Sequence, residues 1–319
     1  MSTDTLVRVE AMSRYYAEHC AVNDLSFTVQ RGEVLGFLGP NGAGKTTTMQ
    51  ILCGVLAASG GTVSIAGHNI VEQPFLAKRH LGYLPEKPPL YREALVDEYL
   101  RYCAALRRLP RSARGEAIAK AKQRCGLAEE GGRLIANLSK GYQQRVGIAQ
   151  AILHAPDVVV LDEPTSGLDP NQIVEIRALI RELSQDHSVI LSTHILPEVQ
   201  TTCDRVLIIN HGRLVLDEAL SALRSDQTLQ HLHIALLHPP AVAELQVLDG
   251  VMEVTPLDTQ RFRLACRRDG NTAAALARTA AQRDWGLYEL IPQADNLEET
   301  FVQLTRGDYL ERSPQEGRS

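Results

Sequence analysis

The sequence lacks any uninterrupted apolar stretch that reaches the roughly 20 residues a helix needs to cross a bilayer. If the protein works at a membrane, another subunit must therefore supply the membrane-spanning part. Its first residues include Asp4, Arg8 and Glu10, so the sequence predicts no secretory signal.

Cysteine is scarce and scattered, because the 319 residues contain six, with no C-x-x-C pair. This pattern predicts reduced thiols in a cytosolic protein and argues against a disulfide framework or a zinc site. Positive charge is not in excess either, since the formal net charge is −5. That balance argues against a broad nucleic-acid-binding surface and leaves room only for a local basic patch.

What is present is an ordinary soluble composition, with 44% apolar and 22% charged residues. The length is sufficient for two domains, each with its own core.

The most informative segment is Gly39 to Thr46, GPNGAGKT, which fits the phosphate-binding pattern G-x-x-x-x-G-K-[ST] at every defined position. The apolar run Val34 to Leu38 precedes it as a predicted strand, and Thr46 to Leu56 can form a helix. Glycines let backbone N–H groups converge on a polyphosphate. Lys45 supplies charge for the β- and γ-phosphates, and Thr46 supplies a hydroxyl for Mg²⁺. A chance glycine-rich turn is the alternative, and the strand–loop–helix context favours binding of a nucleoside triphosphate.

Strands and helices alternate along the first two thirds of the chain, which predicts an α/β fold with a mainly parallel sheet. Leu6 to Val29 predicts an antiparallel β subdomain, and Leu95 to Gly126 predicts an inserted helical subdomain. The other expected elements are strands at Thr62–Ile65, Asp157–Asp162, Ser188–Ser192 and Arg205–Ile209, and a helix at Pro170–Leu183.

A second domain is predicted after a linker at residues 223–228. Its pattern is βαββαβ, which is typical of a small ferredoxin-like α+β domain. The expected elements are Leu229–Leu237, Ala241–Leu248, Val251–Leu257, Arg261–Cys266, Asn271–Gln282 and Leu287–Ile291. We therefore predict a nucleotide-binding domain over 1–223, with its helical subdomain at about 90–155, an accessory domain over 228–307 and a disordered tail over 308–319.

Two carboxylates, Asp162 and Glu163, end a predicted buried strand and would lie beside the phosphate site. Asp162 would hold Mg²⁺ through water, and Glu163 would orient and deprotonate the attacking water. An ordinary acidic strand end is the alternative. Pro164 and the run Thr165–Asp169, which follow directly, favour the functional interpretation.

A phosphate loop alone fits a kinase, a GTPase, a helicase or a transporter motor. Leu138 to Arg145 reads LSKGYQQR, which resembles the LSGGQ signature of ATP-binding-cassette (ABC) ATPases. Further motifs follow the order of that family over roughly residues 6–218. The resemblance implies an ABC nucleotide-binding domain that uses ATP and Mg²⁺.

The resemblance also implies a role for each matching residue. Nucleotide contacts fall on Tyr16, Gly39, Pro40, Asn41, Gly42, Ala43, Gly44, Lys45, Thr46, Thr47 and Glu86. The metal would be near Thr46, Glu86 and Asp162, and the catalytic residues would be Glu163 and the switch histidine His194. The signature is Ser139, Lys140, Gly141, Tyr142 and Gln143, and the D-loop is Ser166, Gly167, Leu168 and Asp169.

Some assignments depart from the family pattern. The adenine-stacking aromatic is Tyr16 or its neighbour Tyr15. Tyr16 is preferred because the family aromatic usually directly precedes a glycine, and in this sequence that glycine is replaced by Ala17. Glu86 stands where glutamine is usual, so its contact would be metal-directed or water-mediated. Lys140 and Tyr142 replace residues that are commonly glycine or glutamine, while the signature serine and the glycine that follows are retained.

The resemblance implies a homodimer or a pair of ABC subunits, in which Ser139 and Gly141 of one copy cap the γ-phosphate bound by the other. It also implies a separate membrane permease that docks on the helical subdomain, at the cytoplasmic face of the membrane. The sequence is most similar to ATPases of ABC-2-type exporters, of the gliding-motility and copper-maturation types. Two alternatives stay open: mechanical signalling across the membrane, and a soluble process on ribosomes or DNA. The accessory domain would serve dimerisation or regulation, or only stabilise the fold.

Overall fold

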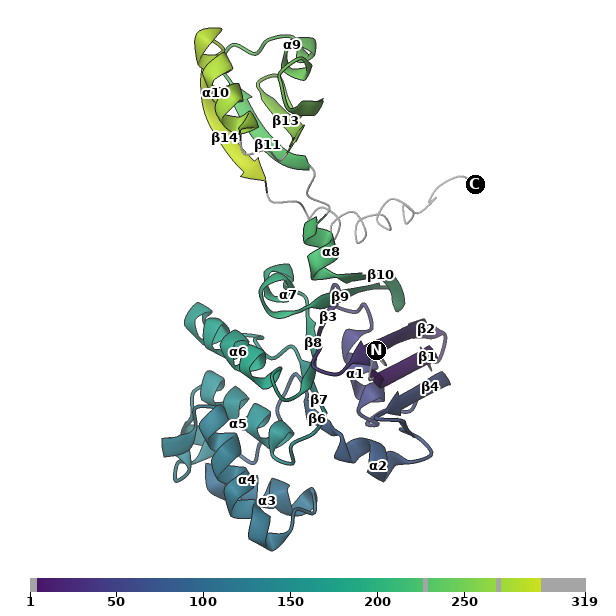
Figure 1. The fold of residues 1–319 in the computed structure, drawn as a ribbon. Coiled ribbons are helices and arrows are strands. Elements are labelled where there is room, and N and C mark those ends of the chain that lie inside the picture. Colours follow the sequence, from purple (N-terminus) through teal and green to yellow (C-terminus); the bar gives the residue numbers. More distant parts are fainter. Residues whose placement is uncertain (1–4, 226–228, 268–270, 294–319) are drawn as a thin grey trace, which may run out of the picture. The chain divides into compact units, whose positions relative to one another are not determined.

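The computed structural model describes residues 5–225, 229–267 and 271–293 (Figure 1). These residues form two compact units, which divide between Leu220 and Ser221. None of the helices in the described parts of the chain is long and apolar enough to cross a membrane. The predicted tail over 308–319 lies outside the described residues.

An antiparallel sheet opens the first unit, as the alternating sequence predicts. Its strand order is β2-β1-β4-β5. Strand β1 turns into β2 at a tight hairpin in which Tyr16 pairs with His19. The strands are β1 (Thr5–Tyr16), β2 (His19–Gln30), β4 (Gly60–Ile65) and β5 (His68–Asn69).

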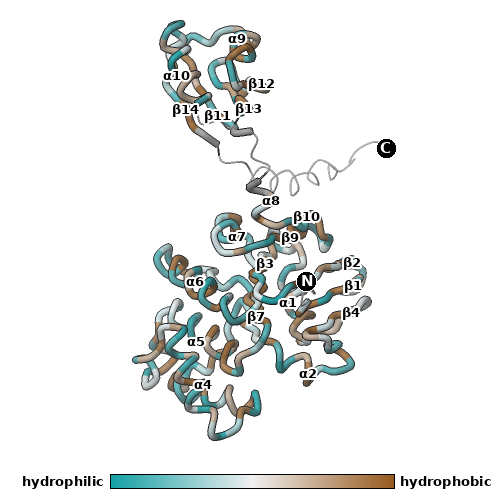
Figure 2. Tube along the Cα trace, in the orientation of Figure 1, coloured by the Kyte–Doolittle hydropathy of each residue, from teal (hydrophilic) through white to brown (hydrophobic). Residues whose placement is uncertain are grey.

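The second sheet has six strands in the order β10-β9-β3-β8-β7-β6, and all neighbours are parallel except β9 and β10. Its central strands are continuous apolar runs, visible as brown segments at β3 and β7 in Figure 2, because both faces of the sheet are covered. The strands are β3 (Val34–Leu38), β6 (Leu81–Leu84), β7 (Val158–Asp162), β8 (Ser188–Thr193), β9 (Arg205–Asn210) and β10 (Arg213–Ala219).

Alternate residues of each central strand point to opposite layers of the unit. Leu35 and Phe37 of β3 pack into one core with the antiparallel sheet and the first helix. Gly36 faces the other way, and a Cβ there would lie 2.8 Å from Cys203 Sγ, so α7 packs closely against β3. The helices that contact the six-stranded sheet are α1 (Lys45–Leu52), α2 (Pro74–Arg79), α5 (Lys140–Ile152), α6 (Pro170–Leu183) and α7 (Leu196–Thr202).

Helix α1 is shorter than predicted. It ends at Leu52 and not at Leu56, since Gly54 adopts a left-handed φ of +60° and its N–H bonds to Ile51 O. The predicted helix at Pro170–Leu183 matches α6 at both ends: Asp169 caps it by accepting from Gln172 N, and proline stands at its first position.

A helical group lies between β6 and β7 in the chain and contains α3 (Val96–Leu106), α4 (Arg111–Arg124) and two 3₁₀ turns, Ala128–Glu130 and Ile135–Asn137. Pro110 stands directly before α4 and separates the two helices. Arg124 at the end of α4 bonds His187 and Asp186, which anchors this group to the loop before β8.

The second unit contains a four-stranded antiparallel sheet in the order β12-β13-β11-β14. Its first and third strands lie in the middle, the arrangement of the ferredoxin-like domain that the βαββαβ order predicts. The core includes Leu264 and Trp285. The elements are β11 (Leu229–Leu236), α9 (Val242–Gln246), β12 (Val251–Pro256), β13 (Arg261–Arg267), α10 (Thr272–Gln282) and β14 (Leu287–Gln293).

The linker prediction is wrong at its start. Helix α8 (Leu220–Ser225) continues through residues that were expected to be linker, because leucine, alanine and arginine there are good helix formers. Residues 226–228 lie outside the described residues.

Candidate functional site

The site begins at the carboxyl end of β3, where the chain turns through the phosphate loop into α1. Gly42 and Gly44 have φ of +82° and +103°, a region that favours glycine. A Cβ on Gly44 would lie 2.4 Å from Ala21 O, and one on Gly39 would lie 2.4 Å from Ile209 O. The loop therefore requires these glycines, and it directs the N-terminus of α1 toward the cavity beside it.

Lys45, the first residue of α1, is nearly buried at 6% exposure. Its Nζ donates to the carbonyl oxygens of Gly39 at 2.9 Å and Pro40 at 3.2 Å. The same nitrogen lies 3.5 Å from Glu163 Oε1. The lysine charge is thus fixed between the loop and the end of β7, where it can attract a polyphosphate.

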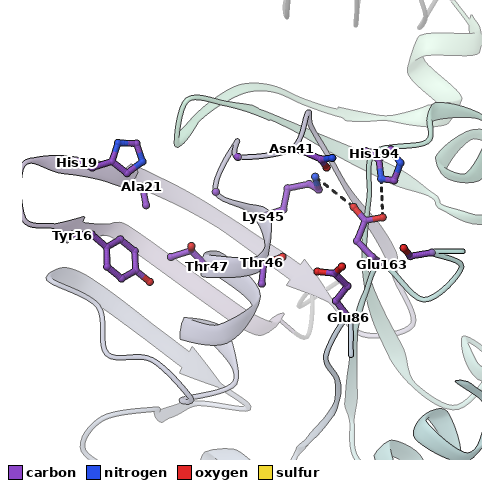
Figure 3. Close-up of a pocket in the computed structure, with 13 residues that line it drawn as sticks. Tyr16, His19, Ala21, Asn41, Lys45, Thr46, Thr47, Glu86, Glu163 and His194 are labelled. Carbon is purple, nitrogen blue, oxygen red and sulfur yellow. Dashed lines mark hydrogen bonds and ion pairs between the residues drawn. The ribbon is translucent and has the colours of Figure 1, made fainter. Parts of the chain in front are cut away.

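The end of β7 carries the predicted acidic pair. Glu163 has a left-handed φ of +48°, held by a hydrogen bond from its N–H to Ser192 O at 3.1 Å. This turn points the Glu163 carboxylate into the cavity (Figure 3). A non-glycine residue in this conformation costs about 1–3 kcal/mol, and such strain occurs where a side chain must be aimed.

Asp162 lies one residue earlier and is fully buried. Its Oδ1 accepts hydrogen bonds from the hydroxyls of Ser192 and, at 3.4 Å, Thr46. Its Oδ2 is buried without a hydrogen-bond partner. Burial raises the pKa of Asp162, and the charge of Glu86 raises it further, while Ser192, Thr46 and Lys45 oppose the shift.

A divalent cation fits these donors. An orphaned, buried carboxylate oxygen beside a threonine hydroxyl has the hard oxygen chemistry that Mg²⁺ prefers. The cation would also offset the unfavourable burial of the Asp162 charge. Thr46 and Asp162, with Glu86 beyond them, are the residues that would hold it, directly or through water.

His194 follows β8 and completes the inner wall of the cavity. Its Nδ1 lies 2.9 Å from Glu163 Oε2, so the carboxylate of Glu163 is held by His194 on one side and Lys45 on the other (Figure 3). The His194 side chain remains 44% exposed, whereas that of Glu163 is 10% exposed. The histidine is therefore accessible to a bound group while it orients the carboxylate.

The cavity has a volume of about 560 Å³. The structure brings eleven of the 23 predicted site residues to its wall, with two that the sequence did not single out, His19 and Ala21. Its lining consists of Tyr16, His19, Ala21, Asn41, Gly42, Gly44, Lys45, Thr46, Thr47, Glu86, Glu163, Ser166 and His194. Of the other phosphate-loop residues, Ala43 is buried and bonds through its backbone to Pro40 and Gly212.

Tyr16 lies at the outer end of the cavity, with the Arg14 guanidinium 4.7 Å from the centre of its ring. Tyr15 is not among the residues that line the cavity. His19 was missed although its signal is in the sequence: a hairpin closing at Ala17-Glu18 places it opposite Tyr16. Finding it required the register of the hairpin.

The signature residues start α5, away from this cavity. Ser139 caps the helix by accepting from Tyr142 N at 3.3 Å, and Gln143 donates to the carbonyl oxygens of Ile135 and Leu138. Lys140 is exposed, while Gly141 is buried and lies against Gln172 of α6. Among the described residues of one chain, none of 139–143 lines the cavity.

The D-loop begins at the cavity and ends at α6. Ser166 lines the cavity, and its N–H bonds to Glu163 O at 3.1 Å. Gly167 has φ of +67°, and Leu168 N–H bonds to Thr165 O at 3.1 Å. Asp169 caps α6. The loop is therefore a compact turn that continues directly from the acidic pair.

Known proteins with similar sequences define the family. A family model described as ABC transporter matches residues 22–166. The uncharacterized ABC transporter ATP-binding protein YxlF of Bacillus subtilis (strain 168) is 36% identical over 222 residues, which are 70% of this chain and 74% of the relative. The chain belongs to the ATP-binding subunits of ABC transporters.

Two further comparisons extend this result. The linearmycin resistance ATP-binding protein LnrL of Bacillus subtilis (strain 168) is 27% identical over 306 residues, which are 94% of this chain and 98% of the relative. This similarity therefore runs through the second unit of the ABC subunit. A solved structure of an ATP-binding subunit of an ABC transporter has a TM-score of 0.63 and 32% identity, and the match covers 69% of this chain and 92% of that chain.

Family membership confirms the predicted fold and activity. As an ABC ATPase, the chain binds ATP with Mg²⁺, couples ATP hydrolysis to transport and works with membrane permease components. Lys45, Glu163 and His194 line a single cavity of this ABC subunit.

Proposed function

We propose that this ABC subunit hydrolyses ATP in the cavity at the end of β3, with Glu163 as general base, and that two copies close around two nucleotides to drive an ABC-2-type exporter. The observation that carries the catalytic part is the position of Glu163. Its carboxylate is held between Lys45 Nζ at 3.5 Å and His194 Nδ1 at 2.9 Å, beside the partnerless Oδ2 of Asp162.

The residues divide the work by chemistry. The backbone N–H groups of the loop and the charge of Lys45 bind the phosphates. Glu163 orients a water molecule toward the γ-phosphate and accepts its proton, and His194 holds that carboxylate in place and contacts the γ-phosphate. Mg²⁺, when bound near Thr46 and Asp162, neutralises charge on the phosphate oxygens. Tyr16 stacks on the adenine.

A second copy would complete each site. Ser139 and Gly141 lie at the start of α5, where backbone N–H groups and the helix dipole favour an anion, yet they are absent from the cavity lining of their own chain. A two-fold dimer would place them against the γ-phosphate of the partner, an isologous arrangement. A paired, non-identical ABC subunit would act in the same way.

The transport role follows from the relatives. LnrL carries resistance to linearmycin in its name, which favours export of a compound from the cell. The motif sequences resemble those of ABC-2-type ATPases, so we infer a permease of that type, contacted at the cytoplasmic face of the membrane through the helical group at α3 and α4. The second unit would contribute to dimerisation or regulation.

Glu163→Gln tests the catalytic assignment. Glutamine keeps the size of the side chain and loses the base, so the variant should bind ATP and dimerise while the rate of hydrolysis falls by about 10²–10⁴-fold. ATP binding, size-exclusion chromatography with ATP and phosphate release measure the three properties. Glu116→Gln, on the exposed surface of α4, is the control and should behave like the unmodified protein. Normal turnover in Glu163→Gln would contradict the assignment.

Purification from native membranes tests the transport assignment. An integral-membrane protein with the features of an ABC-2 permease should be recovered with the subunit, and ATP hydrolysis by the reconstituted complex should move substrate. Hydrolysis without substrate movement would favour mechanical signalling. Sedimentation with ribosomes in place of membranes would contradict the exporter.

A further inference from the structure

A buried carboxylate behind the cavity links two loops of the site. Glu198 in α7 is 1% exposed. Its Oε1 accepts from Thr165 Oγ1 at 2.7 Å, and its Oε2 accepts from Thr193 Oγ1 at 2.7 Å. Arg177 Nη2 of α6 lies 3.6 Å from Oε1.

The two threonines stand next to residues of the cavity. Thr165 precedes Ser166, which lines the cavity, and Thr193 precedes His194. Thr193 Oγ1 also accepts from Ile195 N at 3.1 Å, so its hydroxyl spans the turn that contains His194. One carboxylate therefore fixes the start of the D-loop and the loop of His194 at the same time.

Burial of this carboxylate carries a free-energy penalty, so its presence in the interior needs a physical explanation. Removing a charged group from water costs several kcal/mol, and an ion pair in a protein interior is often no more stabilising than apolar side chains of similar volume. The neighbours Leu196 and Val199 are buried apolar residues, so a leucine at 198 would suit the packing of α7. What a leucine lacks is the pair of short, charge-assisted hydrogen bonds that define the positions of both hydroxyls.

The D-loop is held from other directions as well. Asp169 caps α6 at its far end. In the middle, a Cβ on Gly167 would lie 2.2 Å from Lys140 Nζ, so the signature lysine packs directly against the loop. With Glu198 at its start, the loop is held at three points, and of these contacts the one at Glu198 also holds the turn that contains His194.

We propose that Glu198 is a positioning residue for ATP hydrolysis, which holds Ser166 and His194 in a fixed relation across the cavity. Glu198 does not bond to Ser166 or His194 themselves. It acts on them through its hydrogen bonds to the preceding residues, Thr165 and Thr193. The inference rests on the proposed role of His194 in the reaction.

Glu198→Ala tests it in the full-length protein. Loss of both hydrogen bonds should lower kcat for ATP by about 10-fold to 100-fold, since small misplacements in an active site have effects of this size, while KM for ATP changes by less than about 2-fold. Glu198→Gln, which keeps both polar contacts, should recover most of kcat. Glu175→Ala removes an exposed, ion-paired carboxylate of α6 and serves as the control without effect.

A purely structural role predicts a different pattern. The melting temperature of Glu198→Ala would fall, but kcat per folded molecule would equal that of the unmodified protein, and this result would overturn the proposal. Reduced kcat in Glu163→Gln with normal kcat in Glu198→Ala would overturn this inference alone and leave the proposed function intact.

If Glu198→Ala does not fold, the threonines provide the test. Thr165→Ala and Thr193→Ala each detach one loop from the carboxylate, so each should lower kcat. Because either change breaks the same link, the double variant should lose no more than the larger single effect. Independent effects, whose fold-changes multiply in the double variant, would overturn the proposal.

Discussion

The six-stranded sheet of the first unit and the four-stranded sheet of the second unit are built from similar apolar residues and differ in where their strand ends lead. In the first unit, β3, β7 and β8 are parallel neighbours, so the residues that follow them meet at one edge of the sheet. Lys45, Glu163 and His194 come together there from three distant parts of the sequence. Parallel pairing thus concentrates chemistry at one place.

The sheet of the second unit has the opposite property. Because β11, β13 and β14 are antiparallel neighbours, successive strand ends lead to opposite edges. Topology, more than composition, therefore distinguishes the first unit, and three experiments test this difference.

The largest expected effect is that of Asp162→Asn. Hydrolysis should fall by at least about 100-fold, because the charge that would hold Mg²⁺ is lost. The melting temperature of the nucleotide-free protein should rise. The pKa of Asp162 is raised by burial, so its ionisation costs stability as the pH rises above the ordinary pKa of a carboxyl, and asparagine removes this cost.

Phosphate release and thermal unfolding check both halves of this prediction. Glu253→Gln in β12, an exposed acid of the second unit, is the matched control and should change neither property. A lower melting temperature in Asp162→Asn would show that the first unit gains stability from the Asp162 charge, contrary to the prediction.

A matched pair of leucines tests whether the units are separate. Leu207 of β9 and Leu264 of β13 are both fully buried, one in the core of each unit. Either change to alanine should destabilise its own unit by about 2–5 kcal/mol, since it leaves a cavity. Calorimetry should show one shifted transition in each case. Only Leu207→Ala should lower the temperature at which ATP hydrolysis is lost. If Leu264→Ala lowers this temperature by the same amount, the two units unfold together.

The smallest expected effect concerns pH and His154, which lies beside β6 of the six-stranded sheet. His154 Nε2 donates to Leu81 O at 3.0 Å, while its Nδ1 is buried without a partner. Burial lowers the pKa of His154 to about 4, and the charge of Arg107 adds to the shift. The neutral form is therefore favoured in the folded state, and stability is lost as the pH falls from the ordinary histidine pKa toward 4.

The free energy of unfolding of the first unit should decrease by about 2 kcal/mol more between pH 7 and pH 5 than in His154→Gln. Denaturant titrations at the two pH values measure this difference. Equal pH dependence in both proteins would show that His154 is accessible to protons in the folded state.

Local sequence was sufficient to predict those parts of the fold and site that depend on interactions between residues close together in the chain. The phosphate loop, the acidic pair after β7 and the ends of α6 follow from glycine, strand and capping patterns over a few residues. The prediction failed at the end of α1, where a glycine turn was overlooked, and at the start of the linker, where α8 continues. In both cases the competing signals were weak and of similar size.

Residues whose role depends on contacts between distant segments could not be found this way. His19 required the register of the first hairpin, and the same register decides that Tyr16, not Tyr15, lines the cavity. Glu198 has no motif around it, and its importance is visible only through its hydrogen bonds to Thr165 and Thr193, which are 33 and 5 residues away.

By itself, the sequence determined that this chain binds a nucleoside triphosphate and has the motif order of an ABC ATPase, because glycines, a lysine and two carboxylates at fixed spacing carry that chemistry. Only the tertiary structure decided which of these groups meet, at what distances, and that Asp162 has a free oxygen while Glu163 has two partners. The physical reason is that spacing along the chain defines local backbone geometry, whereas burial and the pairing of strands define the electrostatic surroundings in which each side chain acts.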